Sequence, residues 1–527
     1  MTERVSWWTE YGVRVATPLF VVLLIVGLAL GTSALVKGWS GLLGVETAGW
    51  AKAGLLMPEP YTTPWIHSLA LHNAEFHHLL GLWGLLWIIG LAMGWCINVN
   101  KFSLHGFYRN RLIRAYLGAS RALTDHDVRR PNPLTGFDQK DNIYMSELAG
   151  YGADSADRNS MRVQRPLHIV NIALNLVRSE RLAWQQRKAQ SFTVSPLHCG
   201  SWQDIGYRRA HEYGYNSSVN RAISLGTAMA ASGAAASPNM GYHSSPAVTF
   251  LLALFNIRLG WWLGNPGKAG GSSFLGGVGR RLNLWPSYHR SQPAFSIGPL
   301  VAELFGFTDA SRRYVYLSDG GHFENLALYE MVLRRCHHIV VIDVGCDPDL
   351  SFQDLGNAIR KIRIDQGVDI EINTGMIKPQ GDSHYSRWHH AIGSIRYDKV
   401  DPGAPVGTLL YLKHSLTGEE PSDVQDYAAH HKAFPHEPTS DQFFDESQFE
   451  SYRRLGEHIA DKVFSVGLQD GATQSDQLSL GEVIRRLQQH WISVRPGVQG
   501  SSLRGTQAFM DLEKQLRGDP GLARYDT

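Results

Sequence analysis

The sequence predicts an α/β protein with an N-terminal two-helix transmembrane hairpin. Two long stretches near the N-terminus, residues 15–36 and 79–97, are apolar and carry no charge. Beyond residue 160, short runs of apolar and β-branched residues alternate with stretches of helical periodicity, a pattern typical of α/β folds. At 527 residues the chain is long enough for two or three structural units. Its formal net charge of +2 argues against a nucleic-acid-binding surface.

The first apolar stretch reads VATPLFVVLLIVGLALGTSALV and is followed by the first charge at Lys37. It is long enough to cross a bilayer core as a helix. A cleaved signal peptide is the alternative. It is disfavoured because the apolar core is long, no clear small-residue cleavage site is present and a second span follows. That second stretch, LLGLWGLLWIIGLAMGWCI, places Trp95 where an interfacial aromatic residue is expected.

Basic residues around the two spans predict their orientation. Arg4 and Arg14 precede the first span, whereas the loop between the spans carries only Lys37 and Lys52. Five basic residues follow the second span: Lys101, Arg109, Arg111, Arg114 and Arg121. The positive-inside rule therefore predicts a multi-pass protein of the inner (cytoplasmic) membrane, with both termini and the α/β portion in the cytoplasm.

The loop between the spans contains HSLALHNAEFHH, in which four histidines surround Glu75: His67, His72, His77 and His78. Imidazole and carboxylate are zinc ligands, but the i, i+4 spacing that would place two rings on one helical face is missing. Interfacial or solvated histidines are the simpler interpretation, so no metal and no cofactor is predicted. The cysteines lie far apart without CxxC spacing, which favours reduced thiols: Cys96, Cys199, Cys336 and Cys346.

The pattern along the chain predicts four regions. These are the hairpin (1–100), a basic juxtamembrane helix with a linker (101–160), an α/β portion (161–466) and a weakly patterned C-terminal tail (467–527). Within the second region, KFSLHGFYRNRLIRAYLGASR (101–121) has the pattern of an amphipathic basic helix. Its arginines are expected to face either anionic lipid headgroups or solvent.

Periodicity and turn residues predict the elements of the α/β portion. Strands are expected within 165–177, 191–202 and 407–416, helices within 223–238, 251–262 and 445–464, and a helix followed by a strand within 352–373. The Gly-, Pro- and Ser-rich stretch 264–298 predicts a mobile surface loop or lid. No GK[ST] or GxGxxG sequence is present, which argues against a nucleotide-binding phosphate loop.

The stretch YVYLSDGGHFENLALYEMVLRRC (314–336) predicts a buried strand that ends at Asp319, a turn at Gly320 and Gly321, and then a helix. HHIVVIDVGCDPD (337–349) has the same shape, so a βαβ unit with parallel strands is expected. Functional groups collect at the carboxyl ends of such strands, which makes Asp319 a catalytic candidate. The alternative for Asp319 is a helix N-cap. The three later acids are interpreted as capping or solvated loop residues: Asp343, Asp347 and Asp349.

Three stretches together resemble the bacterial membrane-anchored branch of the patatin-like phospholipases: YLSDGGHFENLALYEMVLRRC, AMAASGAAASPNMG and FPHEPTSDQFFDESQFESYRRLGEHI. The resemblance covers about residues 100–465 and implies part of a three-layer α/β/α hydrolase fold. In that family a serine in a GxSxG motif attacks an acyl ester, and the aspartate of a D-G-[GA] motif activates it. Asp319 matches this aspartate, with Gly320 and Gly321 completing the motif.

The chain departs from the family pattern because it contains no GxSxG sequence. The nearest approaches are GWSGL (38–42), GSSFL (271–275) and GSSLRG (500–505), and none fits. Since the family's serine precedes its aspartate, the chain is expected to correspond to the C-terminal portion of a longer enzyme. Ser232, in AASGAAASP, is the best internal substitute for the nucleophile. A pair of His198 and Cys199 is disfavoured, because adjacent side chains usually point in different directions.

Two hypotheses about function follow from the resemblance. In the first, the protein is the membrane-anchored component of a lipid acyl hydrolase with a Ser–Asp dyad, and a separate polypeptide supplies the serine and the oxyanion loop. Membrane lipids would then be both substrate and anchor. In the second, the protein is a catalytically inactive paralogue that acts as a membrane-bound interaction or regulatory module. An adjacent upstream reading frame carrying GGGxR and GxSxG would favour the first hypothesis.

Overall fold

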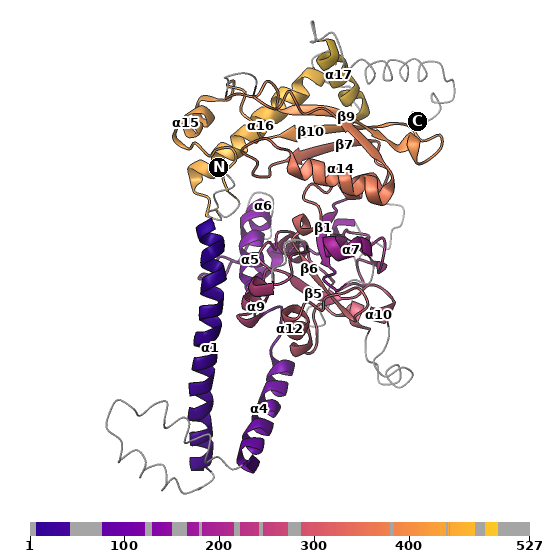
Figure 1. Cartoon of the computed structure of the whole chain (residues 1–527). Coiled ribbons are helices and arrows are strands. Elements are labelled where there is room, and N and C mark those ends of the chain that lie inside the picture. Colours follow the sequence, from indigo (N-terminus) through magenta and orange to yellow (C-terminus); the bar gives the residue numbers. More distant parts are fainter. Residues whose placement is uncertain are drawn as a thin grey trace. The chain divides into compact units, whose positions relative to one another are not determined.

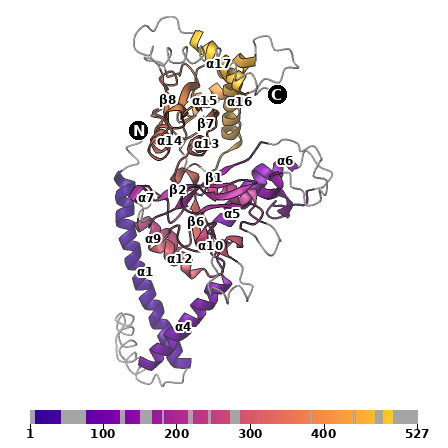
Figure 2. The same ribbon diagram turned by 90° about the vertical axis from the view of Figure 1, so that its right-hand side faces the viewer.

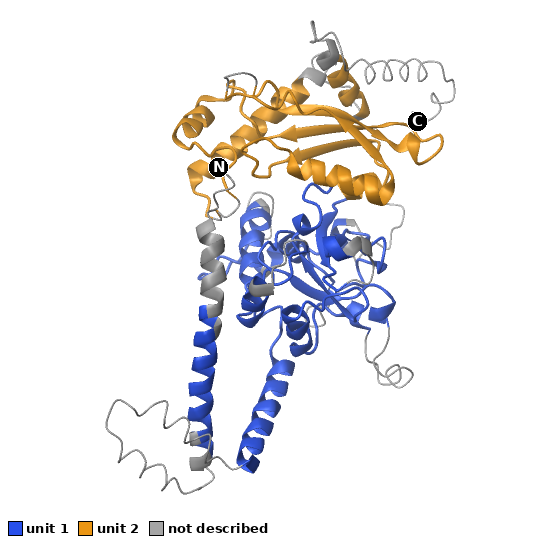
Figure 3. Ribbon diagram, in the orientation of Figure 1, with its two compact units in different colours: residues 1–327 blue, residues 328–527 orange. Residues whose placement is uncertain are grey.

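The computed structural model describes most of the chain between Trp7 and Ser493. The described residues are 7–42, 76–121, 129–149, 166–178, 182–214, 222–241, 246–271, 286–379, 384–438, 441, 443–468 and 480–493. They form two compact units, residues 1–327 and 328–527, coloured separately in Figure 3. Each unit has its own sheet. The protein is therefore a mixed α/β protein, as predicted, but its α/β part is divided at residues 327/328, which the sequence did not indicate.

The first unit begins with two long apolar helices, α1 (Trp7–Leu42) and α4 (Phe76–Cys96), which contact each other (Figure 1). Among the described residues, α4 is long and apolar enough to cross a membrane, whereas α1 contributes a shorter apolar segment, Val22–Val36. Large apolar side chains on both helices are exposed, including Leu23, Leu28, Trp83, Ile88 and Trp95. One candidate membrane helix is thus present, and the two-span hairpin stays a prediction.

The C-terminal end of α4 is attached to the body of the first unit. The carbonyl of Gly94 accepts hydrogen bonds from the backbone N–H of Ser296 at 2.9 Å and from its hydroxyl at 3.0 Å. A few residues later, the amide of Asn100 exchanges two hydrogen bonds with the backbone of Trp262. Figure 2 shows one end of α4 running into the body of the first unit. The apolar helix therefore continues into the folded part of the unit through fixed contacts.

The predicted basic helix at 101–121 is helical, in three pieces: α5 (His105–Leu112), a π-helical segment (Ile113–Gly118) and α6 (Ala119–Arg121). His105 and Ile113 are fully buried, and α5 packs against α8. One face of this segment thus belongs to the protein core, and only the opposite face is available to solvent or headgroups.

Part of the predicted linker is built into the first unit. The carboxylate of Asp141 is fully buried and pairs with Arg121 at 2.8 Å and with Arg129 at 2.7 Å. Tyr144 forms a β-bridge with Ser224, the N-cap of α8. Residues 129–149 of the predicted linker are thus anchored to the first unit by ion pairs to a buried carboxylate, and the rest of 122–160 lies outside the described part.

A six-stranded sheet forms the core of the first unit, in the order β4-β3-β2-β1-β6-β5, and all of its pairings are antiparallel. The strands are β1 (Val170–Asn175), β2 (Ala189–Val194), β3 (His198–Ser201), β4 (Gly206–Arg209), β5 (Trp261–Gly264) and β6 (Tyr314–Ser318). The helices are α7 (Leu182–Arg187), α8 (Leu225–Ser232), α9 (Pro246–Leu254), α10 (Lys268–Gly271) and α12 (Ile297–Leu304). Short 3₁₀ segments comprise Gln139–Asp141, Met145–Ala149, Ser287–His289 and η7 (Gly320–His322).

Two predicted helices of this unit have different bounds from those expected. The small-residue helix α8 ends at Ser232 rather than at Pro238, because Gly233 leaves the helical conformation. The predicted buried helix over 251–262 is wrong beyond Leu254, since Trp261–Gly264 form strand β5 beside β6. An apolar run in a sheet interior has no alternation to distinguish it from a buried helix. Of the predicted lid at 264–298, residues 272–285 lie outside the described part, whereas the remainder includes the end of β5, α10 and the 3₁₀ segment Ser287–His289.

The second unit holds a four-stranded sheet in the order β7-β10-β9-β8, in which β7 and β10 are parallel and the other pairs antiparallel. Its strands are β7 (His338–Asp343), β8 (Asp369–Ile372), β9 (His390–Arg396) and β10 (Gly407–Lys413). Its helices are α13 (Leu328–Leu333), α14 (Gln353–Gln366), α15 (Ser422–His430), α16 (Glu446–Leu468) and α17 (Leu480–Ser493), and one 3₁₀ segment covers Tyr397–Lys399. The helix α17 lies in the tail predicted to be weakly patterned, and its Leu487 is buried in the core formed with α15, α16 and β10.

The predicted βαβ unit is wrong. β6 pairs with β1 and β5 in the sheet of the first unit, whereas β7 pairs with β10 in the sheet of the second. The helix between them, α13, begins at Leu328, where the second unit begins. The strand–helix–strand pattern is a property of neighbouring residues. The sheet that each strand joins depends instead on its pairing partners, which lie far away in the sequence. The strand ends that carry Asp319 and Asp343 therefore belong to different sheets.

Candidate functional site

The first candidate site is the turn that follows β6. Asp319 caps the 3₁₀ turn η7, and its Oδ1 accepts a hydrogen bond from the backbone N–H of Gly321 at 2.7 Å. A Cβ on Gly320 would lie 2.9 Å from the carbonyl oxygen of Asn171, and one on Gly321 would lie 2.8 Å from Oδ1 of Asn325. The backbone of β1 therefore requires a glycine at 320, whereas a side chain at 321 would meet the side chains of Asn325 and Asp319. The predicted N-cap geometry of Asp319 is thus present, and it leaves a catalytic role open.

Burial gives the Asp319 carboxyl an unusual proton affinity. Loss of hydration raises its pKa above the ordinary aspartate value, and the hydrogen bond from Gly321 offsets only part of this effect. Among the described residues, no arginine, lysine or histidine forms an ion pair with it. The phenol of Tyr108, on α5, is near enough that the Asp319 charge contributes, after burial, to a raised pKa of that phenol. A desolvated carboxylate without a cation is suited to accept a proton from a neighbouring hydroxyl.

The small-residue stretch that follows α8 lies beside this turn. The backbone N–H of Asp319 donates to the carbonyl of Ala234 at 3.4 Å. The hydroxyl of Tyr108 lies 2.5 Å from the position that a Cβ on Gly233 would take, so this glycine makes room for the phenol. Two sequence stretches singled out separately, 223–245 and 314–336, are therefore neighbours in the fold.

Ser232, the internal substitute for the nucleophile, lies in the same neighbourhood. Its hydroxyl donates a hydrogen bond of 2.7 Å to the carbonyl of Asn171, the same carbonyl that Gly320 approaches. The hydroxyl proton is thus directed to a backbone oxygen rather than to Asp319. This hydrogen bond joins the C-terminal end of α8 to β1, so Ser232 has a structural role.

A second hydrogen-bonded chain behind the turn was not found from the sequence. The Asn175 amide donates to the Ser318 hydroxyl at 2.7 Å, and Ser318 in turn contacts Nδ1 of His322 at 2.8 Å. The Ser318 hydroxyl therefore bridges Asn175 and His322. Ser318 is fully buried, so the chain fixes the conformation of the DGG turn and offers no accessible nucleophile. The i, i+4 spacing of Ser318 and His322 was the only sequence signal for it.

The structure disfavours the alternative pair of His198 and Cys199. On strand β3, His198 is exposed and Cys199 is fully buried. Burial raises the pKa of the Cys199 thiol to about 12, whereas a nucleophilic cysteine needs a lowered one. The thiol therefore stays protonated at neutral pH and behaves as a small apolar side chain.

The acids after β7 divide into two kinds. Asp347 accepts hydrogen bonds from the backbone of Ser351 and Phe352, which agrees with the predicted capping role. Asp343 differs from the prediction of a solvated or capping residue, because it is buried and pairs with the ammonium of Lys413 at 3.0 Å. The hydroxyl of Tyr411 also donates to it at 2.5 Å. A buried carboxylate that is paired in this way is a structural element of the β7–β10 sheet.

The histidine-rich loop is only partly described. His67, His72 and Glu75 lie outside the described residues, while His77 and His78 begin α4 with their ring centroids 4.1 Å apart. None of the described residues of this loop joins a cluster with metal-ligand geometry.

Comparison with known proteins adds no family. No model of a protein family matches the chain, and no curated protein matches it in sequence. The resemblance to patatin-like phospholipases therefore rests on the three stretches quoted above, and the activity it implies is a proposal.

Proposed function

We propose that the protein is the membrane-anchored component of a patatin-like lipid acyl hydrolase, in which Asp319 is the base of a Ser–Asp dyad. The nucleophilic serine would come from outside these 527 residues, since no GxSxG sequence is present. The observation that carries the proposal is the state of Asp319. Its carboxylate is desolvated, holds one backbone hydrogen bond and has no cation partner among the described residues.

The proposed chemistry is transfer of an acyl group through a serine ester. The serine oxygen attacks the ester carbonyl while Asp319 takes the hydroxyl proton, and that proton then passes to the departing alcohol. Water hydrolyses the acyl-serine with the carboxylate again as base. A carboxylate with a raised pKa is a stronger base than an ordinary aspartate, which suits this role.

Lipid is favoured as the substrate class because the site is linked to apolar helices by fixed contacts. The end of α4 is bonded to Ser296, and the chain then continues into α5, whose Tyr108 lies beside Asp319. The exposed apolar side chains of α1 and α4 are suited to a bilayer rather than to water. We propose that these helices form an inner-membrane hairpin with both termini in the cytoplasm, following the distribution of basic residues.

The proposal is tested with the full chain co-expressed with the polypeptide encoded immediately upstream. Release of fatty acid from phospholipid is measured in membranes for the wild type and for Asp319→Asn. We expect the variant to lose about 10²- to 10⁴-fold in rate, the range of a positioned general base. Asp349→Asn is the matched control, because Asp349 also follows a strand but is exposed and distant from the DGG turn in sequence.

Two results would contradict the proposal. Retained hydrolysis in Asp319→Asn would remove Asp319 from the mechanism. Fluorophosphonate labelling of the chain expressed alone, abolished by Ser232→Ala, would show that the serine lies within the chain. If the wild-type chain with its upstream partner neither hydrolyses phospholipid nor is labelled, the inactive interaction module becomes the better description.

A further inference from the structure

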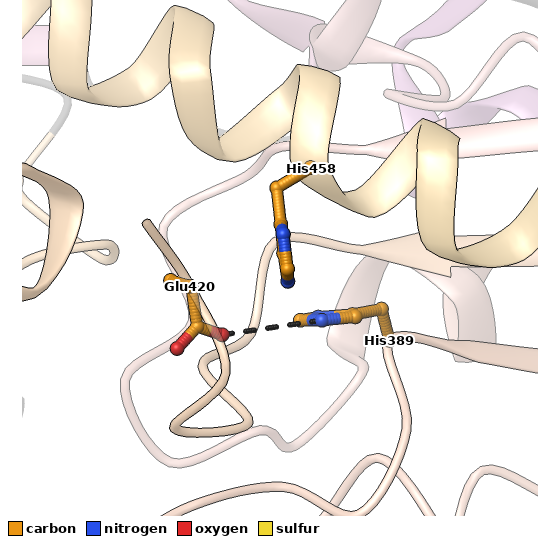
Figure 4. A group of neighbouring side chains, drawn as sticks. All are labelled: His389, Glu420 and His458. Carbon is orange, nitrogen blue, oxygen red and sulfur yellow. Dashed lines mark ion pairs between the residues drawn. The ribbon is translucent and has the colours of Figure 1, made fainter. Parts of the chain in front are cut away.

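The second unit contains a cluster of metal-ligating side chains that plays no part in the proposed hydrolysis. His389, Glu420 and His458 each direct one ligand atom to a common point, and these three atoms all lie within 4.8 Å of one another. Figure 4 shows His458 projecting from α16 toward the other two side chains, with the ion-pair contact between His389 and Glu420 marked. Nε2 of His389 and Oε1 of Glu420 are 3.9 Å apart.

Three separate parts of the chain build this cluster. His389 immediately precedes β9, Glu420 lies in the loop between β10 and α15, and His458 is on α16 between the buried residues Leu455 and Ile459. The side chains of His389 and Glu420 are only 5% and 1% exposed. Buried polar groups need partners. A group or ion bound between these three side chains would therefore affect the free energy of unfolding.

The hydrogen bonds around His389 orient its ring for a ligand. Nδ1 lies 3.3 Å from the hydroxyl of Ser415, and that hydroxyl donates to the carbonyl of Trp388. With the proton on Nδ1, Nε2 offers its lone pair to the space that it shares with the carboxylate of Glu420 and with the Thr417 hydroxyl, which lies 3.3 Å from it. A neutral imidazole held by an outer hydrogen bond is the form that binds metals.

The other two groups also present acceptors. Glu420 is held by the backbone N–H groups of Thr417 and Gly418 at 2.6 and 2.9 Å, and by the Thr417 hydroxyl at 3.1 Å. Nε2 of His458 is buried and has no hydrogen-bond partner among the described residues. A carboxylate oxygen and two imidazole nitrogens, one of them without a hydrogen-bond partner among the described residues, thus converge at one point. An electron-rich point of this kind favours a cation.

We propose that His389, Glu420 and His458 form a zinc site that joins the sheet of the second unit to α16, with a fourth position open to water. Two imidazoles and one carboxylate are a donor set that suits zinc and other transition metals but not calcium or magnesium. Ligand atoms on a tetrahedral zinc are about 3.3 Å apart, given bond lengths of about 2.0–2.2 Å. The observed separations are longer, 3.9 Å between His389 and Glu420 and at most 4.8 Å across the three atoms, so the side chains must draw closer together when zinc binds.

The test uses the full chain purified in detergent without a histidine tag, stripped with a chelator and dialysed into metal-free buffer. Zinc is titrated against a competing chromophoric chelator, and cobalt(II) is used in parallel because its visible absorption reports tetrahedral coordination. We expect one tight site per wild-type chain. His458→Ala should weaken it by more than about 100-fold, since loss of an outer-shell partner already costs about 10- to 100-fold.

The matched controls lie beside the ligands. Glu419→Gln removes the exposed carboxylate next to Glu420, and His430→Ala removes an exposed imidazole on α15. Both should keep the tight site. The proposal is overturned if the wild type binds no zinc tightly, or if His458→Ala and Glu420→Gln bind it as the controls do.

A second measurement separates loss of the site from loss of the fold. Circular dichroism shows whether each stripped variant is folded, and the thermal midpoint is then measured with and without zinc. Zinc should raise the midpoint of the wild type and of the two controls, and leave that of folded His458→Ala unchanged. An equal zinc-dependent rise in His458→Ala would contradict the assignment. Failure of phospholipid hydrolysis has no bearing on these results.

Discussion

The carboxylates of Asp319 and Glu420 are both largely removed from water, but their surroundings differ. Asp319 accepts one backbone hydrogen bond, and burial raises its pKa. Glu420 accepts from two backbone N–H groups and a hydroxyl and faces His389 and His458. The first carboxylate has one hydrogen bond to offset its lost hydration, whereas the second is held by several donors and faces two imidazoles.

This difference separates two uses of a buried acid. A buried carboxylate with few hydrogen bonds is stabilised by protonation, so it is suited to take a proton from a substrate or nucleophile. A well-compensated carboxylate with imidazoles around it gains from a cation, so it is suited to bind a metal. Neutralising each acid by amide substitution should therefore affect the free energy of unfolding in opposite directions.

The largest expected effect on stability is that of Glu420→Gln in the zinc-free chain. The amide NH₂ would replace an oxygen that accepts from Thr417 or Gly418, which leaves at least one buried N–H without a partner. We expect a loss of about 1–3 kcal/mol in the free energy of unfolding, measured by denaturant unfolding in detergent. Glu419→Gln, in an exposed ion pair with Lys462, should change it by less than about 1 kcal/mol. If Glu420→Gln and Glu419→Gln changed the free energy of unfolding equally, the buried hydrogen bonds of Glu420 would not stabilise the fold as argued.

Ser415→Ala tests whether the hydrogen bond to His389 orients the ring. Without the hydroxyl, the Nδ1–H of His389 loses its outer partner and the ring can rotate. Zinc affinity should fall about 10-fold or more, while one site per chain remains in the competition titration. Ser422→Ala, at the start of α15, is the control and should leave the affinity unchanged. An unchanged affinity in Ser415→Ala would mean that the packing of His389, not this hydrogen bond, holds the ring.

Asp319→Asn should stabilise the protein slightly while it abolishes the proposed activity. Because the folded-state pKa is raised, the folded protein binds this proton more tightly than the unfolded chain. The contribution of this carboxyl to the free energy of unfolding is therefore largest at low pH. It decreases as the pH rises from the pKa of the carboxyl in the unfolded chain to its raised pKa in the folded protein. The amide resembles the protonated acid and keeps an oxygen for the Gly321 N–H. A higher thermal midpoint at pH 7 is expected, and a lower one would contradict the desolvation argument.

The pH dependence of hydrolysis is the smallest effect expected. The groups that face Asp319 are the Gly321 N–H and the Tyr108 phenol, and neither carries a positive charge. Since the carboxylate must be ionised to act as a base, kcat/KM should fall on the acid side through an apparent pKa above about 3.9, the ordinary aspartate value. A profile that stays flat below that value would exclude Asp319 as the base.

Local features of the fold could be predicted from the sequence. Strand β6, the DGG turn and strand β7 lie within the expected stretches, because an apolar run followed by glycines determines them over a few residues. Asp319 was found for the same reason. The apolar character of α4 also follows from composition alone.

Longer-range features could not be predicted from the sequence. The strands β6 and β7 have the same local pattern, yet β6 pairs with β1 from about 140 residues earlier and β7 pairs with β10 from about 70 residues later. Strand partners depend on complementary surfaces distributed over the whole chain, and local periodicity carries no information about them. Division of the α/β part into two units follows from that choice of partners.

The two candidate sites differ in the same way, because one is local in the sequence and the other depends on long-range packing. Asp319, Gly320 and Gly321 are consecutive, so the sequence by itself determined that a carboxylate would cap a tight turn after a buried strand. His389, Glu420 and His458 are separated by about 30 and 40 residues and share no motif. Only the packing of α16 against the β9–β10 sheet brings their ligand atoms together, because a side-chain cluster depends on distances that folding creates.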